Sequence, residues 1–189
     1  HLAGMDFRTA VAWIQEHLAA GEDATQRPRT EALTTEGSRG LRLPIRDNRL
    51  LARVRQYLTQ RRCLSAALVV PLGASGKLYA DRRGNAVFLL VAGKTQRPVG
   101  AELRGTGPRV WRGMAPGTRK DAGYFWIGTP ACREIVLCES AIDAISCLQL
   151  HTEHRTAPLP GPCLFISTAG VRSDAPWLYF LLARGYRIY

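Results

Sequence analysis

Residues 135–150 read IVLCESAIDAISCLQL, and the spacing of the apolar residues changes within this stretch. Three aliphatic residues and Cys138 form a continuous apolar run, which is typical of a strand buried on both faces of a parallel sheet. Glu139 ends the run, and the apolar residues after it recur at helical spacing. Functional groups of such sheets gather at the carboxyl ends of the strands. We therefore predict that Glu139 lies exposed at the edge of a parallel sheet.

The C-terminal third of the chain continues the alternation of strands and helices. PCLFIS at 162–167 reads as a second strand, APWLYFLLAR at 175–184 as a helix and YRIY at 186–189 as the start of a third strand. Strands that alternate with helices form a parallel sheet covered on both faces. We expect residues 129–189 to form an α/β domain of this kind.

The residues upstream have a different organisation. A helix that begins after the N-cap Asp6 and ends before Gly21 is predicted within an N-terminal segment 1–21, and a polar linker at 22–38. Residues 39–128 then read as a basic α+β subdomain. Its expected elements are a helix at 48–61, with its arginines outward, and strands at 76–80, 85–93 and 99–105.

Positive charge is concentrated in the middle of the chain. The 189 residues carry a net charge of +11. Nine Lys or Arg and two acids lie between Asp81 and Lys120, whereas residues 129–189 hold five of each sign. A basic face of this kind usually binds phosphates, so nucleic acid is favoured over a merely solvated surface.

Several other classes of protein are disfavoured. No apolar run is long enough to cross a membrane, and the N-terminus lacks the apolar core of a signal peptide. The five cysteines are scattered without a CxxC pair, as expected of thiols in a reducing compartment. We therefore expect a cytoplasmic protein with no membrane association and no zinc site made from these cysteines alone.

Two residue types have alternative interpretations. Asp143 follows Ser140 at the spacing of a helix capping box, but it also lies one turn after Glu139, where a second carboxylate can hold Mg²⁺ or shuttle a proton. Trp111 and Trp126 flank basic residues and are candidates for stacking on bases, although burial in a core is the favoured role.

Several motifs together resemble a known family. IVLCESAIDAISCLQLH looks like the first motif of the Toprim domain of bacterial and plasmid primases, and LFISTAGVRSDAPWLYFLLARGYRIY looks like its continuation. Upstream, YLTQRRCLSAALVVPLG, GNAVFLL, GAELRGTG and GTRKDAGYFWIG are similar to the basic half of the primase core in plasmid and conjugative-element proteins. MDFRTAVAWIQEHL resembles the helix that closes the zinc-binding module of primases.

The resemblance implies a primase, a nucleotidyltransferase that makes short primers on single-stranded DNA during plasmid replication or conjugation. It implies Mg²⁺ or Mn²⁺ as the cofactor, ribonucleoside triphosphates as substrates, and a helicase or relaxase as a further partner. Glu139 would be the Toprim glutamate, acting as a metal ligand or in proton transfer, with Asp143 as a second catalytic candidate. The residues expected to bind template and nucleotide phosphates are Arg82, Arg83, Arg104, Arg112, Arg119 and Lys120.

Two parts of the family pattern are missing from this sequence. The zinc ligands belong to an upstream module, and the Asp-x-Asp pair belongs after the third strand, inside which Tyr189 falls. We therefore expect a fragment of a larger primase, inactive alone, because magnesium-dependent phosphoryl transfer needs several acidic ligands. Two alternatives remain: a non-catalytic DNA-binding module of a mobilisation or replication protein, and a Toprim nuclease or topoisomerase.

Overall fold

The structure of the protein is a computed structural model. The predicted N-terminal segment at 1–21 and the linker at 22–38 lie outside the described residues. The structure describes residues 40–93, 95–129, 132–154, 162–170 and 175–188.

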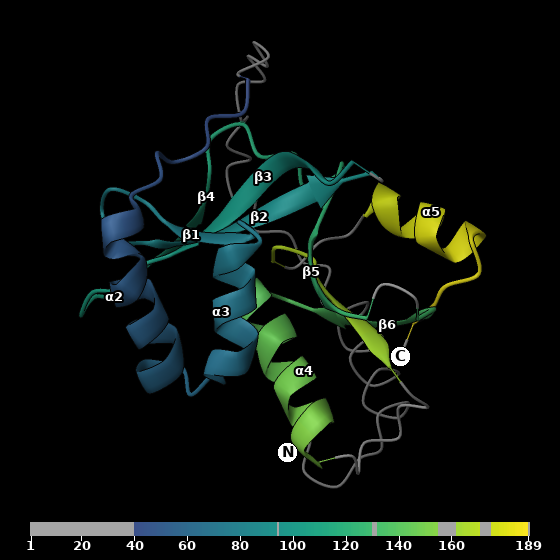
Figure 1. Cartoon of the computed structure of the whole chain (residues 1–189). Coiled ribbons are helices and arrows are strands. Elements are labelled where there is room, and N and C mark those ends of the chain that lie inside the picture. Colours follow the sequence, from purple (N-terminus) through teal and green to yellow (C-terminus); the bar gives the residue numbers. More distant parts are fainter. Residues whose placement is uncertain (1–39, 94, 130–131, 155–161, 171–174, 189) are drawn as a thin grey trace, which may run out of the picture. The chain divides into compact units, whose positions relative to one another are not determined.

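The described residues form two sheets, and the first is antiparallel and pairs four strands in chain order (Figure 1). Its two longest strands pair with each other and are mostly buried, as their apolar sequences predict. A register shift interrupts this pair between Leu90 and Val91. The strands are β1 (Leu78–Ala80), β2 (Ala86–Ala92), β3 (Arg97–Arg104) and β4 (Arg112–Met114).

The second sheet is mixed and has the strand order β5-β7-β6-β8. Three of its strands are parallel, as predicted, and β5 pairs antiparallel with β7. The predicted α/β class is confirmed, but the sheet is not purely parallel, because a short strand from before residue 129 joins its edge. The strands are β5 (Phe125–Gly128), β6 (Glu134–Cys138), β7 (Cys163–Ser167) and β8 (Arg187–Ile188).

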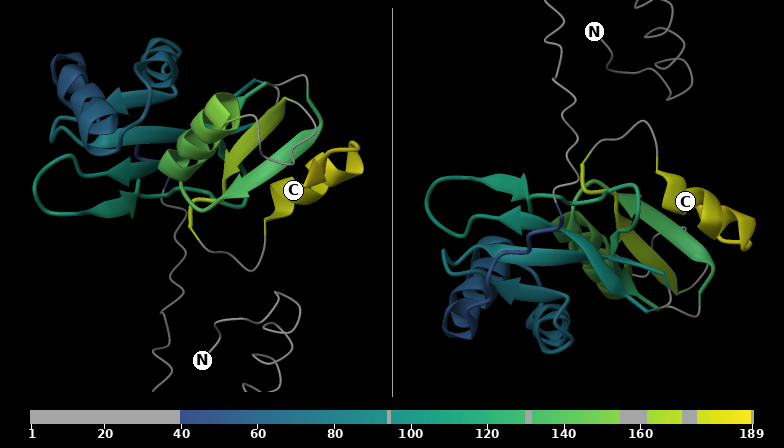
Figure 2. Two further views of the ribbon diagram at one scale, coloured as in Figure 1. Left: turned by 90° about the horizontal axis from the view of Figure 1, so that it is seen from below. Right: turned by 90° about the horizontal axis from the view of Figure 1, so that it is seen from above.

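Helices cover both faces of the second sheet, as predicted. Phe165 of β7 belongs to the same core cluster as Ile145 of α4 (Ala141–His154). The next residue of β7, Ile166, packs in a separate cluster with Trp177 of α5 (Pro176–Ala183). Neighbouring strand residues point to opposite faces, so α4 and α5 lie on opposite sides of the strands (Figure 2).

The predicted helix at 48–61 is confirmed, and a helix that was not predicted follows it. The first segment joins η1 (Asn48–Leu50), α2 (Leu51–Gln56) and the π-helical η2 (Tyr57–Arg61), with its buried residues Val54 and Leu58 inward. The new helix, α3 (Ala66–Ala74), contains a proline, which usually argues against a helix interior.

The two sheets share a core and a backbone bridge. Phe88 of β2, Phe125 of β5 and Ile145 of α4 are fully or almost fully buried in one apolar cluster, to which α2 and α3 also contribute. Val91 and Tyr124 exchange two backbone hydrogen bonds of 3.0 and 3.2 Å, which join the first sheet to the chain entering the second. The position of one sheet therefore depends on the other.

Replacement of Gly123 by alanine should test this junction. A Cβ at Gly123 would lie against the carbonyl oxygen of Val91 and 2.6 Å from Cγ2 of Val99, so the bridge must shift. We expect Gly123→Ala to lower the free energy of unfolding by about 1–3 kcal/mol in chemical denaturation, as overpacking does. Gly40→Ala is the control, since a Cβ there meets nothing within 4 Å. Equal stability of the two variants would contradict the role of the junction.

Candidate functional site

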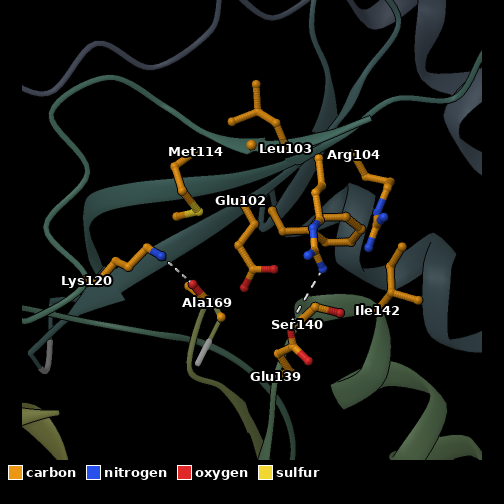
Figure 3. A pocket seen from close by; sticks show the side chains of 13 residues that line it. Glu102, Leu103, Arg104, Met114, Lys120, Glu139, Ser140, Ile142 and Ala169 are labelled. Carbon is orange, nitrogen blue, oxygen red and sulfur yellow. Dashed lines mark hydrogen bonds and ion pairs between the residues drawn. The ribbon is translucent and has the colours of Figure 1, made fainter. Parts of the chain in front are cut away.

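A cavity of about 440 Å³ lies where the two sheets meet (Figure 3). One wall comes from β3 and β4 of the first sheet, and the opposite wall comes from the turns that follow β6 and β7. Charged side chains from both sheets line this cavity. Its lining consists of Phe88, Glu102, Leu103, Arg104, Arg112, Gly113, Met114, Lys120, Glu139, Ser140, Ile142, Ala169 and Gly170.

Glu139 lies at the carboxyl end of β6, as the strand-to-helix pattern predicts. Its side chain is 54% exposed, and its Oε1 is 3.6 Å from Nη1 of Arg112. An exposed ion pair of this length contributes little to stability, because water screens both charges. Both side chains are therefore available to a ligand.

Two further cations line the same cavity. Arg104 lies directly across the β3–β4 ladder from Arg112, and it is half-buried. Lys120 is also half-buried, and its Nζ donates a hydrogen bond of 2.6 Å to the carbonyl oxygen of Ala169. An ammonium group has three donors, so Lys120 keeps donors for a ligand. Three of the six basic residues predicted to bind phosphates thus come together here.

The other three basic candidates do not line the cavity. Arg82 and Arg83 are exposed in the turn between β1 and β2, where their backbone N–H groups donate hydrogen bonds to Ile45 and Asp81. Arg119 is exposed and forms a 2.6 Å ion pair with Asp121. Their roles in phosphate binding remain predictions.

Asp143 completes a capping box at the start of α4. Its Oδ2 accepts hydrogen bonds from the backbone N–H and the hydroxyl group of Ser140, at 3.1 and 2.7 Å. The Asp143 N–H in turn donates to Ser140 Oγ at 3.3 Å. Asp143 does not line the cavity. Asp143 was predicted either to cap the helix or to act as a second carboxylate of the site, and the structure shows the cap.

The cavity also contains a buried carboxylate, Glu102, that the sequence analysis missed. Its Oε2 accepts a hydrogen bond of 3.0 Å from the backbone N–H of Ala141, and its Oε1 accepts a hydrogen bond from the hydroxyl group of Ser167. Glu102 therefore ties β3 to the turns after both β6 and β7. The sequence does contain a signal: Glu102 is the single acid within the apolar stretch VGAELRG, and charged residues are rarely buried without partners.

Burial raises the pKa of Glu102 above the ordinary glutamate value. The hydrogen bonds from Ser167 and Ala141 oppose this shift, and the nearby Asp143 charge adds to it. The Lys120 charge also opposes the shift, though less than the other contributions. Burial raises the pKa because a buried charge loses its hydration.

The turn after β7 positions the carbonyl oxygen of Ala169, which accepts the hydrogen bond from Lys120. Ala169 has a φ of 57°, which few residues other than glycine adopt. Its N–H donates to Ser167 Oγ at 3.0 Å, and the Gly170 N–H donates to the carbonyl oxygen of Glu139 at 2.8 Å. The same Ser167 hydroxyl group thus contacts Glu102 and supports the strained turn.

Among the described residues, no three His, Cys, Asp or Glu side chains are grouped so as to hold a metal ion. Both oxygens of Glu102 already accept hydrogen bonds, and Asp143 Oδ2 accepts two. Of the two carboxylates in the cavity lining, Glu139 is the one that is open to a cation.

In the part of the chain that the structure describes, no helix is long and apolar enough to span a membrane.

Residues 56–127 match a family described as "Protein of unknown function (DUF3991)". The match runs from the end of α2 into β5, so it includes Glu102 and the cavity cations but ends before Glu139. No curated protein and no solved structure matches the chain. The resemblance to Toprim primases thus receives no support from these comparisons and remains a prediction.

Replacement of Glu102 should separate its hydrogen bonds from its charge. Glu102→Ala leaves the Ala141 N–H and the Ser167 hydroxyl group without this partner, and we expect a loss of about 1–3 kcal/mol in the free energy of unfolding. Glu102→Gln keeps an acceptor for Ala141 and a polar group beside Ser167, so it should be at least as stable as the wild type at pH 8.

The pH dependence follows from the raised pKa of Glu102. The folded protein holds this proton more tightly than the unfolded chain, so the contribution of Glu102 to stability is greatest below the unfolded pKa and falls as pH rises through the folded pKa. The stability advantage of Glu102→Gln should therefore shrink as pH is lowered toward the ordinary glutamate pKa. Urea denaturation between pH 4 and pH 8 measures it, and a difference that does not change with pH would contradict the assignment.

Proposed function

We propose that the cavity binds phosphate groups of single-stranded DNA and of nucleotides, as part of a primase-type core. The observation that supports this proposal is the arrangement at the cavity, where Glu139 at the carboxyl end of β6 faces Arg112, with Arg104 and Lys120 beside them. Phosphoryl transfer depends more on positioned charges than on covalent chemistry, and this cavity supplies such charges.

The balance of charge in the cavity favours an anion. Arg104, Arg112 and Lys120 are cations, whereas Glu139 and Glu102 are the acids of the lining. Glu102 is buried, and both of its oxygens already accept hydrogen bonds, so Glu139 is the acid that an incoming phosphate would face directly. Arginine donors in a forked geometry also suit phosphate oxygens.

Exposed basic residues also lie outside the cavity lining. Nε of Arg53, an exposed residue of α2, donates a hydrogen bond of 3.1 Å to Thr106 in the β3–β4 loop. The same threonine donates a 2.7 Å hydrogen bond to the carbonyl oxygen of Gly84, next to Arg83. A nucleic-acid strand has several phosphates, so cations on successive elements favour a strand over a free nucleotide as the main ligand.

The primase assignment rests on the resemblance around Glu139. A Toprim glutamate at this position would act as a metal ligand or in proton transfer in a longer protein, with ribonucleoside triphosphates as substrates. A non-catalytic DNA-binding module is the second candidate. The hydrogen bonds that engage Glu102 and Asp143 favour it, because they leave Glu139 as the open carboxylate of the cavity lining.

Single-stranded DNA should bind to the chain with a steep dependence on salt. Binding to phosphates releases counterions, and each phosphate contact contributes about 0.7 to the slope of log affinity against log salt for single strands. The double variant Arg104→Ala, Arg112→Ala should weaken binding for every sequence and lower the slope by about 1.4 if both side chains contact phosphate. Fluorescence anisotropy of a labelled oligonucleotide between low and moderate salt measures both effects.

Arg119→Ala is a matched control for this experiment. Arg119 is the sequence neighbour of Lys120, a residue of the cavity lining, but its own side chain is paired with Asp121 and lies outside that lining. The substitution therefore removes one positive charge without changing the cavity lining. Its effect should be smaller than that of Arg112→Ala alone. An affinity that does not change with salt, or equal losses for Arg112→Ala and Arg119→Ala, would contradict phosphate binding in the cavity.

Glu139→Gln should distinguish catalysis from binding. The side chain is largely exposed and its ion pair is long, so we expect the free energy of unfolding to change by less than about 0.5 kcal/mol. DNA affinity should stay the same or rise slightly, because a negative charge leaves the cavity. In a longer natural chain with further acidic ligands, the same substitution should abolish primer synthesis. Normal primer synthesis by a longer chain that carries Glu139→Gln would refute the catalytic role, and a longer wild-type chain that never makes primers would favour the binding module.

A further inference from the structure

Trp111 is an exposed aromatic residue on the hairpin that forms one wall of the cavity. It lies just before β4 and is 46% exposed, and its neighbour Val110 is 90% exposed. Burial in a core, the role favoured from the sequence, is therefore wrong for Trp111. The ring of Trp126, by contrast, already has polar partners within the protein. Its indole N–H donates a hydrogen bond of 2.7 Å to Gln96, and Nζ of Lys77 lies 2.9 Å from its ring centroid.

Two glycines provide the space in which the Trp111 ring rests. A Cβ at Gly113 would lie 3.0 Å from Cζ2 of the indole, and a Cβ at Gly105 would lie 3.2 Å from the Trp111 Cβ. The Gly105 N–H also donates a 2.9 Å hydrogen bond to the Trp111 carbonyl oxygen. The ring therefore lies against the hairpin backbone while much of its surface remains open to solvent.

The charges around Trp111 indicate what kind of ligand this ring would meet. From Leu103 to Lys120 the chain has five Lys or Arg residues and no Asp or Glu. Arg109 and Arg112, on either side of Trp111, are both exposed. An open aromatic ring among cations suits a ligand that carries both negative charge and flat aromatic groups. Single-stranded nucleic acid has both, whereas the bases of a duplex are stacked on each other.

The place of β4 in its sheet connects Trp111 with the cavity. β4 is the last strand in the order of the first sheet, and among the described residues no strand pairs with its other edge. Arg112 lines the cavity, and the hydrogen bond between Gly105 and the Trp111 carbonyl group continues the β3–β4 pairing by one residue before Arg112. Neighbouring residues of a paired strand alternate between its two faces. A strand of nucleic acid that passes over this edge would therefore meet Arg112 on one side and Trp111 on the other.

We propose that Trp111 is a stacking platform for an unpaired base of single-stranded nucleic acid whose phosphates bind at Arg104 and Arg112. This inference rests on the proposed phosphate-binding function and adds a contact to the base. It assigns the β3–β4 hairpin to the interface and makes a single strand the preferred ligand over a duplex. Stacking does not depend on hydrogen bonds to the base edge, so the contact tolerates every base.

The experiment compares two oligonucleotides of equal length and charge, one with bases and one fully abasic. Each is titrated into the 189-residue chain while anisotropy of the label and tryptophan emission are recorded. The wild type should bind the base-bearing strand more tightly and show quenched emission with it. Trp111→Ala should lose about tenfold in affinity for that strand and leave affinity for the abasic strand unchanged. Trp111→Phe should retain most of the affinity while losing most of the quenching.

Val110→Ala is the matched control, since it removes an even more exposed apolar side chain from the same hairpin without removing a ring. It should leave the ratio of the two affinities as in the wild type. Equal affinities of wild type and Trp111→Ala for the base-bearing strand would overturn the platform while leaving phosphate binding intact. Equal losses for both strands in Trp111→Ala would also overturn it, because the effect would then come from the hairpin backbone. If the wild type binds neither strand, both the platform and the proposed function are overturned.

Discussion

The hydrogen bonds of Glu102 determine how the two sheets meet at the cavity. A carboxyl group from β3 accepts from Ala141 at the start of α4 and from Ser167 at the end of β7. The group is buried, so its polar atoms need partners inside the protein, and these partners belong to the two turns that position Glu139 and Ala169. A buried polar group thus fixes the geometry of exposed charges.

Burial of the Glu102 carboxylate is unfavourable, and this raises its pKa. A carboxylate removed from water is unfavourable beside other acids, and proton uptake relieves the penalty. Lys120 opposes proton uptake, while Asp143, which caps α4, promotes it. Asp143, which builds the α4 terminus, thus raises the pKa of a carboxyl group that lines the cavity.

Local patterns in the sequence correctly predicted the position of Glu139 after β6, the helix α4 and the strands β1, β2 and β3, because neighbouring residues decide these features. The role of Glu102 depends on partners 39 and 65 residues away, and no local period reveals such a contact. The joining of β5 to the second sheet was missed because four residues are too few to show a period. The exposure of Trp111 depends on Gly113 and on the place of β4 at the end of its sheet, which only the strand order reveals.

The weakness of the Arg112–Glu139 ion pair is itself informative about the site. A short, buried pair would hold both side chains in place and would cost several kcal/mol to separate. At 3.6 Å and largely exposed, this pair holds them only loosely, and water already competes for both groups. A phosphate oxygen can therefore replace the carboxylate as the partner of Arg112 at little cost, which leaves Glu139 free beside the bound phosphate. Under the proposed function, a carboxylate released beside a bound phosphate would be able to hold a metal ion or exchange a proton, whereas in a binding module the same exchange would simply admit the strand.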